Sequence, residues 1–344
     1  SIDFIGAVLL VAGTVPLLLG FTWAGTQYAW NSGVIIGLFA AAVLALTAFF
    51  VYEAKLEHSD GQPIISPSLF KNRIFSISTL VTAIFGAGLF GSTFFIPLFV
   101  QGVVGTSATN SGLILTPLML TSVAGSIISG QLVSRIGKYK WIAITGMAVS
   151  VIGTMLLMRL DVHASNTDVL IAMLILGLGM GFGMALYTLI VQNAMPRKIG
   201  EATSALTFFR AIGGTIGLAI MGSIMNSAYL PAFHNALPET VKRAVPAKAL
   251  SPLDNPQILL SADAQTKMHQ AFAAFGPAGE QLYHTLLEAV KVGLTQGLHN
   301  VFILSTVIMV LGLLAVLFLK EIPLHGNSNK APQEQREEVL QPQA

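Results

Sequence analysis

Long runs of apolar residues, separated by short polar segments, dominate the chain. The runs are continuous and lack the alternation of barrel strands, so each is predicted to be a helix. A helix needs about 20 apolar residues to cross a bilayer, because its backbone groups must be hydrogen-bonded within the segment. The runs that meet this length cover residues 4–22, 33–52, 75–100, 111–133, 141–158, 169–193, 202–226 and 299–319. The predicted fold class is an all-α integral membrane bundle of eight transmembrane helices.

Composition supports a lipid environment. Hydrophobic residues make up 53% of the chain and charged residues only 10%, which is too few for an ordinary water-facing surface. The formal net charge of +2 is too small to predict a nucleic-acid partner. The chain has no cysteine, which excludes disulfides, iron-sulfur clusters and thiolate zinc sites, and we predict neither a metal nor a cofactor.

The basic residues of the short loops predict the orientation. Lys and Arg are concentrated in one set of alternate loops, which we assign to the cytoplasm, whereas the opposite set holds only Arg159. With an even number of spans, both ends of this chain are expected in the cytoplasm, and the membrane is expected to be a bacterial plasma membrane. The cytoplasmic set is Lys55, Lys71, Arg73, Arg135, Lys138, Lys140, Arg197 and Lys198.

The same pattern divides the chain into segments. Residues 1–52 are expected to form two helices, 53–74 a cytoplasmic linker, 75–319 a six-helix unit and 320–344 a disordered cytoplasmic tail. The external loop 227–298 holds six prolines, which predict an irregular entry. Apolar residues at helical spacing over 282–294 predict a separate amphipathic helix at the membrane surface or over the pore mouth. The alternative is a loosely packed external cap without a direct role.

Glycines at regular spacing indicate close helix packing. The sixth span contains Gly177, Gly179, Gly181 and Gly183, and the seventh contains Gly213 and Gly217. Small residues four apart let helix backbones approach closely, and smooth faces of this kind also permit the rocking movements of a transporter. Prolines inside the apolar runs predict kinks, at Pro16, Pro97 and Pro117.

Arg210 is the main candidate for a functional residue. It lies about nine residues into the seventh span, where a guanidinium needs a counter-ion, a water-filled cavity or a path to the headgroups. It is therefore either part of a substrate or coupling path, or a structural residue that snorkels to the surface. The acids, including Asp3 and Glu53, lie at or near span ends, so no deeply buried carboxylate is predicted.

Further candidates are polar and aromatic side chains within the spans. Gln101, Tyr187 and Gln192 are candidate pocket residues, with Phe94 and Phe95 as aromatic walls, although ordinary packing explains each of them as well. The chain has no H-E-x-x-H, G-x-S-x-G or Walker A sequence. We therefore predict no catalytic residue, and a protein that is not an enzyme.

The turn after the fourth span carries a family motif. Residues 130–140, with the sequence Gly-Gln-Leu-Val-Ser-Arg-Ile-Gly-Lys-Tyr-Lys, resemble the G-x-L-x-D-R-x-G-R-K loop motif of the major facilitator superfamily. Ser134 stands where the motif has an acid, and Tyr139 replaces a base. Arg135 and Lys138 are expected to hold the loop inside, and Gly130 and Gly137 to permit a tight connection.

Two further segments resemble one branch of that superfamily. Pro97-Leu-Phe-Val-Gln101 with Gly105, Gly112 and Pro117, and Arg210-Ala-Ile-Gly-Gly-Thr-Ile-Gly217 with Gly213 and Gly214, are similar to the fourteen-helix drug/proton antiporters of the EmrB/QacA type. Members of this branch have six helices, two extra helices and six more. The resemblance implies that this chain is the two extra helices and the second six, and that the missing N-terminal half carries the proton-coupling acids.

The function implied by the resemblance is secondary active transport. Its partners would be the lipid bilayer, a small-molecule substrate that is lipophilic or cationic, and protons. Spans three to five and six to eight would form the two inverted repeats of one transporter half. A dedicated-substrate exporter or importer of the same superfamily remains an alternative, as does a membrane receptor or scaffold that does not transport.

Overall fold

The computed structural model describes residues 3–25, 27–59, 61, 63–105, 108–244, 250–254 and 262–322. In this part of the chain, eight helices are long and apolar enough to cross a membrane, which confirms the predicted fold class. They are α1 (Phe4–Trp23), α2 (Gly33–His58), α3 (Arg73–Phe99), α4 (Ala108–Ile136), α5 (Lys140–Met158), α6 (Asn166–Ala194), α7 (Ile199–Ala236) and α11 (Pro277–Leu317). The predicted tail beyond residue 322 lies outside the described residues.

Polar residues just before the apolar runs set where several helices begin. Asp3 Oδ1 accepts a hydrogen bond from the Gly6 amide of α1 at 2.8 Å, and Asn72 Oδ1 accepts from the Ile74 amide of α3 at 2.9 Å. Ser165 and Asp168 form a capping box at the start of α6. These bonds satisfy amides that would otherwise lack a partner at the first turn.

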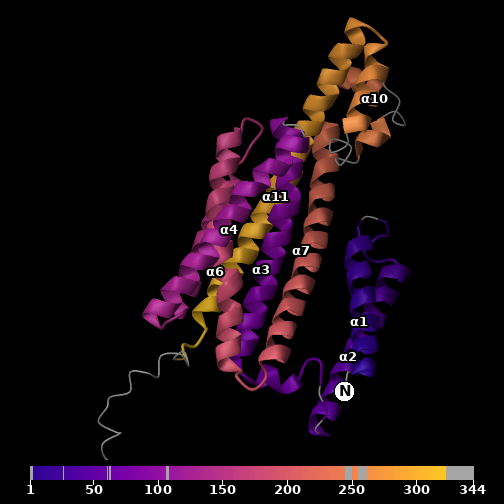
Figure 1. Ribbon diagram of the computed structural model, residues 1–344. Helices are drawn as coiled ribbons and strands as arrows, with labels where there is room; N and C mark the ends of the chain where they lie inside the picture. Colours follow the sequence, from indigo (N-terminus) through magenta and orange to yellow (C-terminus); the bar gives the residue numbers. More distant parts are fainter. Residues whose placement is uncertain are drawn as a thin grey trace, which may run out of the picture.

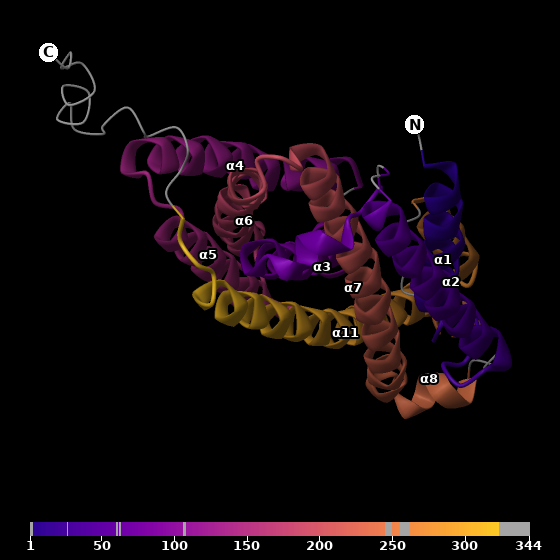
Figure 2. The same cartoon turned by 90° about the horizontal axis from the view of Figure 1, so that it is seen from below.

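The helices form a six-helix unit and a separate pair. In the unit, α3 contacts α6, α7 and α11, while α5 lies between α6 and α11 and α4 packs along α6 (Figures 1 and 2). Helices α1 and α2 pack on each other, and α1 touches the unit beside α7. The pairings of α4 with α6 and of α7 with α3 are the pattern that two three-helix repeats would give.

The glycines of α6 pack against three different neighbours. A Cβ atom on Gly177 or Gly181 would overlap backbone carbonyls of α4, and one on Gly179 would lie 2.5 Å from the Ser150 amide of α5. Gly183 lies against the ring of Phe85 in α3. The close packing predicted from glycine spacing is therefore confirmed for α6.

Helices α3 and α7 approach each other in the same way. A Cβ atom on Gly213 would overlap the Ala83 carbonyl, and one on Gly217 would lie 2.8 Å from the Cα of Ala87. On the α3 side, Gly86 leaves room for the backbone of Arg210. The backbone of α7 thus lies directly on α3, where no side chain fits between them.

A polar cluster ties the helix pair to the six-helix unit. Lys198, in the turn between α6 and α7, forms an ion pair with Glu57 of α2 at 2.7 Å. Its Nζ also donates hydrogen bonds to Ser66 Oγ at 3.0 Å and Ser68 Oγ at 3.1 Å, in the segment that follows α2. The linker is thereby fastened to the end of the bundle, and it is not a free tether.

The external segment differs from the prediction. Helix α7 continues through Pro231 to Ala236, and α11 is one helix of 41 residues, so the irregular entry and the separate amphipathic helix over 282–294 are both wrong. Leu286, Val290 and Leu294 are buried because this part of α11 packs on the extended end of α7. The helices α8 (Glu239–Ala244) and α10 (Ala262–Ala273) and the short η3 (Ser251–Asp254) complete a projecting cap (Figure 1).

The turn between α4 and α5 confirms one predicted glycine role and contradicts another. Gly137 has a φ of 69°, which favours glycine, whereas Gly130 lies inside α4 with open space beside it. Tyr139 is buried, and its hydroxyl donates to the Lys320 carbonyl at 2.7 Å and accepts from the Ile322 amide at 2.9 Å. Burial raises the pKa of Tyr139. The tyrosine that departs from the motif therefore fastens the segment that follows α11.

Candidate functional site

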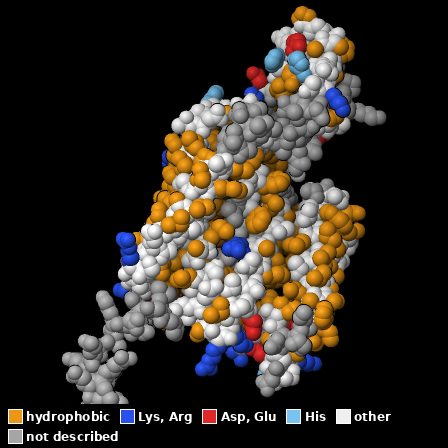
Figure 3. Space-filling model, viewed as in Figure 1, with side chains coloured by type: hydrophobic (Ala, Val, Ile, Leu, Met, Phe, Trp, Pro, Cys, Tyr) orange, Lys and Arg blue, Asp and Glu red, His pale blue; other side chains and the backbone are white. Residues whose placement is uncertain are grey.

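A largely apolar cavity of about 720 Å³ lies where α3, α4, α6 and α7 meet. Hydrophobic side chains gather on this face of the bundle, with an isolated patch of basic atoms among them (Figure 3). Its lining consists of Phe90, Thr93, Leu118, Met119, Ser122, Val123, Ser126, Ile127, Met184, Ala185 and Arg210. A cavity of this size and lining suits a lipophilic molecule of drug size.

Arg210 is the charged residue of the lining. Its backbone carbonyl lies so close to Gly86 that a Cβ atom there would overlap it, which fixes the depth of Arg210 beside α3. None of the ion pairs found among the described residues includes Arg210. The guanidinium can therefore meet a substrate group or an acid that approaches from the open side of the cavity.

The wall formed by α4 carries two serines one turn apart. Ser126 Oγ is hydrogen-bonded to the carbonyls of Ser122 and Gly181, each at 3.0 Å, so this hydroxyl also joins α4 to α6. Sequence reasoning missed both serines. Two hydroxyl residues at i and i+4 in an apolar span were the available signal, because they share one helix face.

The other five candidate pocket residues lie outside the cavity lining. Phe94 is 51% exposed and Phe95 is buried in the core, while Phe90, one turn earlier, lines the cavity. Tyr187 is buried, with no hydrogen-bond partner for its hydroxyl.

The two candidate glutamines, Gln192 and Gln101, lie at helix ends, away from the cavity. Gln192 Nε2 donates to Thr203 Oγ1 at 3.3 Å, which links α6 to α7. Gln101 lies in the π-helical turn η2 (Val100–Val104) that follows α3 and its Pro97. The structure thus brings only Arg210, of the six candidates, into the cavity.

The motif residues occupy two regions. Gly214 supports the cavity, because a Cβ atom there would overlap the ring of Phe90. Gly213 and Gly217 hold α7 against α3, as described above. Arg135 and Lys138 are exposed at the α4–α5 turn.

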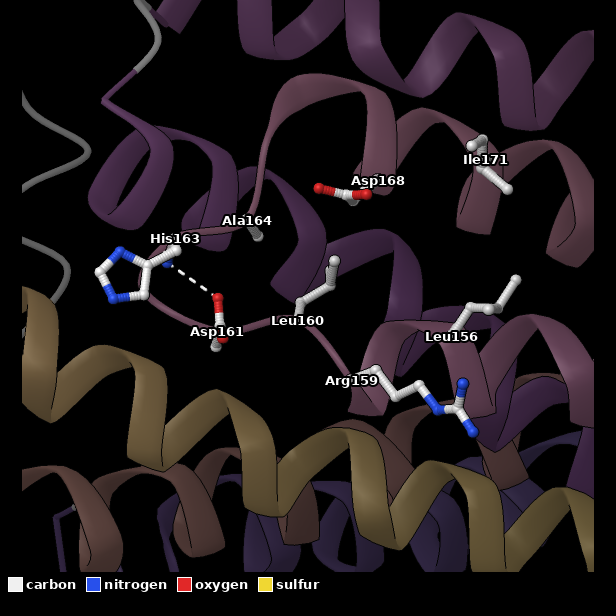
Figure 4. A pocket seen from close by; sticks show the side chains of 8 residues that line it. All are labelled: Leu156, Arg159, Leu160, Asp161, His163, Ala164, Asp168 and Ile171. Carbon is white, nitrogen blue, oxygen red and sulfur yellow. Dashed lines mark hydrogen bonds between the residues drawn. The ribbon is translucent and has the colours of Figure 1, made fainter.

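A second pocket, of about 390 Å³, lies between the end of α5 and the start of α6. Its acids already have local partners: Asp161 accepts from the His163 amide at 2.8 Å, and Asp168 caps α6 (Figure 4). The guanidinium of Arg159 points away from both acids (Figure 4). The described residues contain no group of three or more potential metal ligands. The two acids of this pocket therefore have structural roles, Asp161 in the turn and Asp168 in the cap of α6.

One acid contradicts the sequence prediction. Glu53 lies within α2, and its exposed fraction is 0%, although it was expected near the surface at the end of a span. The start of α1 and the segment after α2 fold over it, which the hydropathy pattern does not reveal.

Comparisons with known proteins agree on one family. The model of the Major Facilitator Superfamily matches residues 4–218. Multidrug transporter protein MdtP of Bacillus subtilis is 36% identical over 350 residues, which cover 98% of this chain and 61% of that protein. Multidrug resistance protein 3 of the same organism is 30% identical over 320 residues, covering 93% of this chain and 59% of that protein.

A third relative is similar to this chain over nearly the whole length of both proteins. The tetracycline resistance determinant of Streptomyces rimosus is 27% identical over 357 residues, which cover 97% of this chain and 94% of that protein. The chain thus spans about three fifths of the two Bacillus relatives and nearly all of this one.

Proposed function

The chain belongs to the major facilitator superfamily, and from this premise we propose that it forms part of a transporter that expels lipophilic or cationic drugs in exchange for protons. The superfamily consists of membrane transporters, so the chain is a multi-pass membrane protein and not an enzyme. The relatives named for multidrug transport and tetracycline resistance support drugs as the substrate class.

The cavity at Arg210 is the observation that carries the proposal. Methionine and aromatic side chains in its lining adapt to lipophilic molecules of different shape. The positive charge of Arg210 suits an acid that alternates between a charged and a protonated state better than it suits a cationic drug. We therefore assign Arg210 to proton coupling and the apolar wall to substrate binding.

We further propose the domain organisation of the fourteen-helix antiporters. Residues 1–52 would be the two extra helices, 53–74 the linker and 75–319 the second six-helix half. Six further helices would close the open side of the cavity and supply the acid that meets Arg210. The coverage of 61% of one relative supports a longer transporter.

The distribution of basic residues supports the orientation. Lys198 and the other Lys and Arg of the α2–α3, α4–α5 and α6–α7 connections would face the cytoplasm, together with both ends of this chain. The cap formed by α8, η3 and α10 would then lie outside.

Drug binding in the cavity can be tested with cysteine, because the chain has none. Val123→Cys places a thiol on a cavity residue that is 60% exposed, and Val292→Cys places one on α11 that is 45% exposed and outside the cavity. At an ethidium concentration of about ten times its Kd, labelling of Val123→Cys by N-ethylmaleimide is expected to slow about tenfold. Labelling of Val292→Cys should not change. Equal rates with and without ethidium at both positions would remove the cavity as the drug site.

A further inference from the structure

We propose that Asp3 and Glu53 hold one proton between them and form a protonatable site at the base of the α1–α2 pair. Glu53 has an exposed fraction of 0%, and neither of its carboxylate oxygens has a hydrogen-bond partner in the described structure. Asp3 Oδ2 is also buried without a partner, while Asp3 Oδ1 accepts from the Gly6 amide at 2.8 Å.

The two carboxyl groups converge on one point. A Cβ atom on Gly6 would lie 2.6 Å from Glu53 Oε1 and would overlap Asp3 Oδ2, so the absence of a side chain at Gly6 admits both groups. Two carboxylates side by side and removed from water repel each other strongly if both are charged. One shared proton removes that repulsion and gives an oxygen of one group a donor from the other.

The surroundings favour a proton over a metal ion. Tyr52, which precedes Glu53 in α2, faces Asp3. The amides of Ile64 and Ile65 lie toward Glu53, but not in the geometry of a hydrogen bond. Amide hydrogens are donors and would repel a bound cation, which instead needs several oxygen ligands. None of the ion pairs among the described residues includes Asp3 or Glu53.

Because of where the site lies, loss of its proton would act on the packing of α1 against α2. Glu57, one turn further along α2, is paired with Lys198 in the α6–α7 turn. Loss of the proton from Glu53 would charge both carboxyl groups and push the start of α1 away from this anchored end of α2. A contribution of this movement to proton-coupled transport rests on the proposed function, whereas the site itself rests on its geometry.

The site can be tested by infrared spectroscopy and by thermal unfolding of the purified protein. At neutral pH, Glu53→Gln is expected to remove a carboxylic-acid C=O band that the wild-type protein shows. A proton held only in the folded state makes stability fall as pH rises, because the folded protein then binds more protons than the unfolded chain. Glu53→Gln should flatten this fall in the unfolding temperature. Glu57→Gln, the matched control, should leave both the band and the slope in place.

Three results would overturn the assignment: an acid band that is unchanged in Glu53→Gln, a pH slope unchanged in that variant, or stabilisation by Na⁺ that the variant abolishes. The first two would show that Glu53 carries no proton, and the third would make the site a cation site. None of these measurements needs a transported substrate. Failure of the proton site is therefore distinguishable from failure of the proposed transport function.

Discussion

Arg210→Ala is expected to reduce proton-driven ethidium efflux by a factor of about 30 or more, because loss of one member of the charge pair proposed between Arg210 and an acid of the other helices typically costs about 2–5 kcal/mol. The assay uses proteoliposomes that hold the complete transporter proposed above. The side chain provides the charge of the cavity wall, and its backbone position is fixed by Gly86. Arg210→Lys keeps the charge but loses the planar guanidinium, so it should retain part of the activity.

The matched control is Arg197→Ala. Arg197 is exposed in the α6–α7 turn, outside the cavity, so its loss should leave efflux unchanged. The amount of protein inserted and its unfolding temperature are measured for all variants. If Arg210→Ala inserts normally and exports ethidium at the wild-type rate, Arg210 is a structural residue and the coupling role is wrong.

Gly213→Ala is expected to destabilise the bundle by about 1–3 kcal/mol, the usual cost of forcing extra volume into a packed interface. The new Cβ atom would overlap the Ala83 carbonyl, which is backbone and cannot turn aside as a side chain would. Helices α3 and α7 would have to separate, and both contribute to the cavity wall. Efflux should therefore fall together with the unfolding temperature.

Gly222→Ala is the control on the same helix. A Cβ atom on Gly222 would meet no other atom within 4 Å, so this change should leave stability and efflux near their wild-type values. Intrinsic helix propensity favours alanine equally at both positions. A destabilisation of the same size in both variants would show that the α3–α7 contact is not the cause.

The sequence predicts the spans well because length and apolar content decide which segments can cross a bilayer. It also predicts the packing role of the α6 glycines, since residues four apart share a helix face. The extension of α7 and α11 beyond the membrane could not be read from hydropathy. Each helix there is stabilised by the other, through contacts such as those of Gly293 with Tyr229 and Phe233.

The site was only partly predictable. Arg210 stands out because a charge within an apolar span is rare. The rest of the cavity lining depends on which faces of four helices meet. The spacing of residues within a single helix does not show which neighbour each face packs against. Glu53 was misplaced for the same reason, because residues distant in the sequence bury it.

Transport driven by a proton gradient is the central claim, and one measurement tests it most directly. Proteoliposomes with the complete transporter proposed above are loaded with ethidium, and a pH gradient is imposed. We predict that ethidium is exported, that export stops when a protonophore collapses the gradient, and that tetracycline slows ethidium export by competition. An ethidium export rate that is the same with and without the gradient, or no transport of either compound, would contradict the account of a proton-coupled drug exporter.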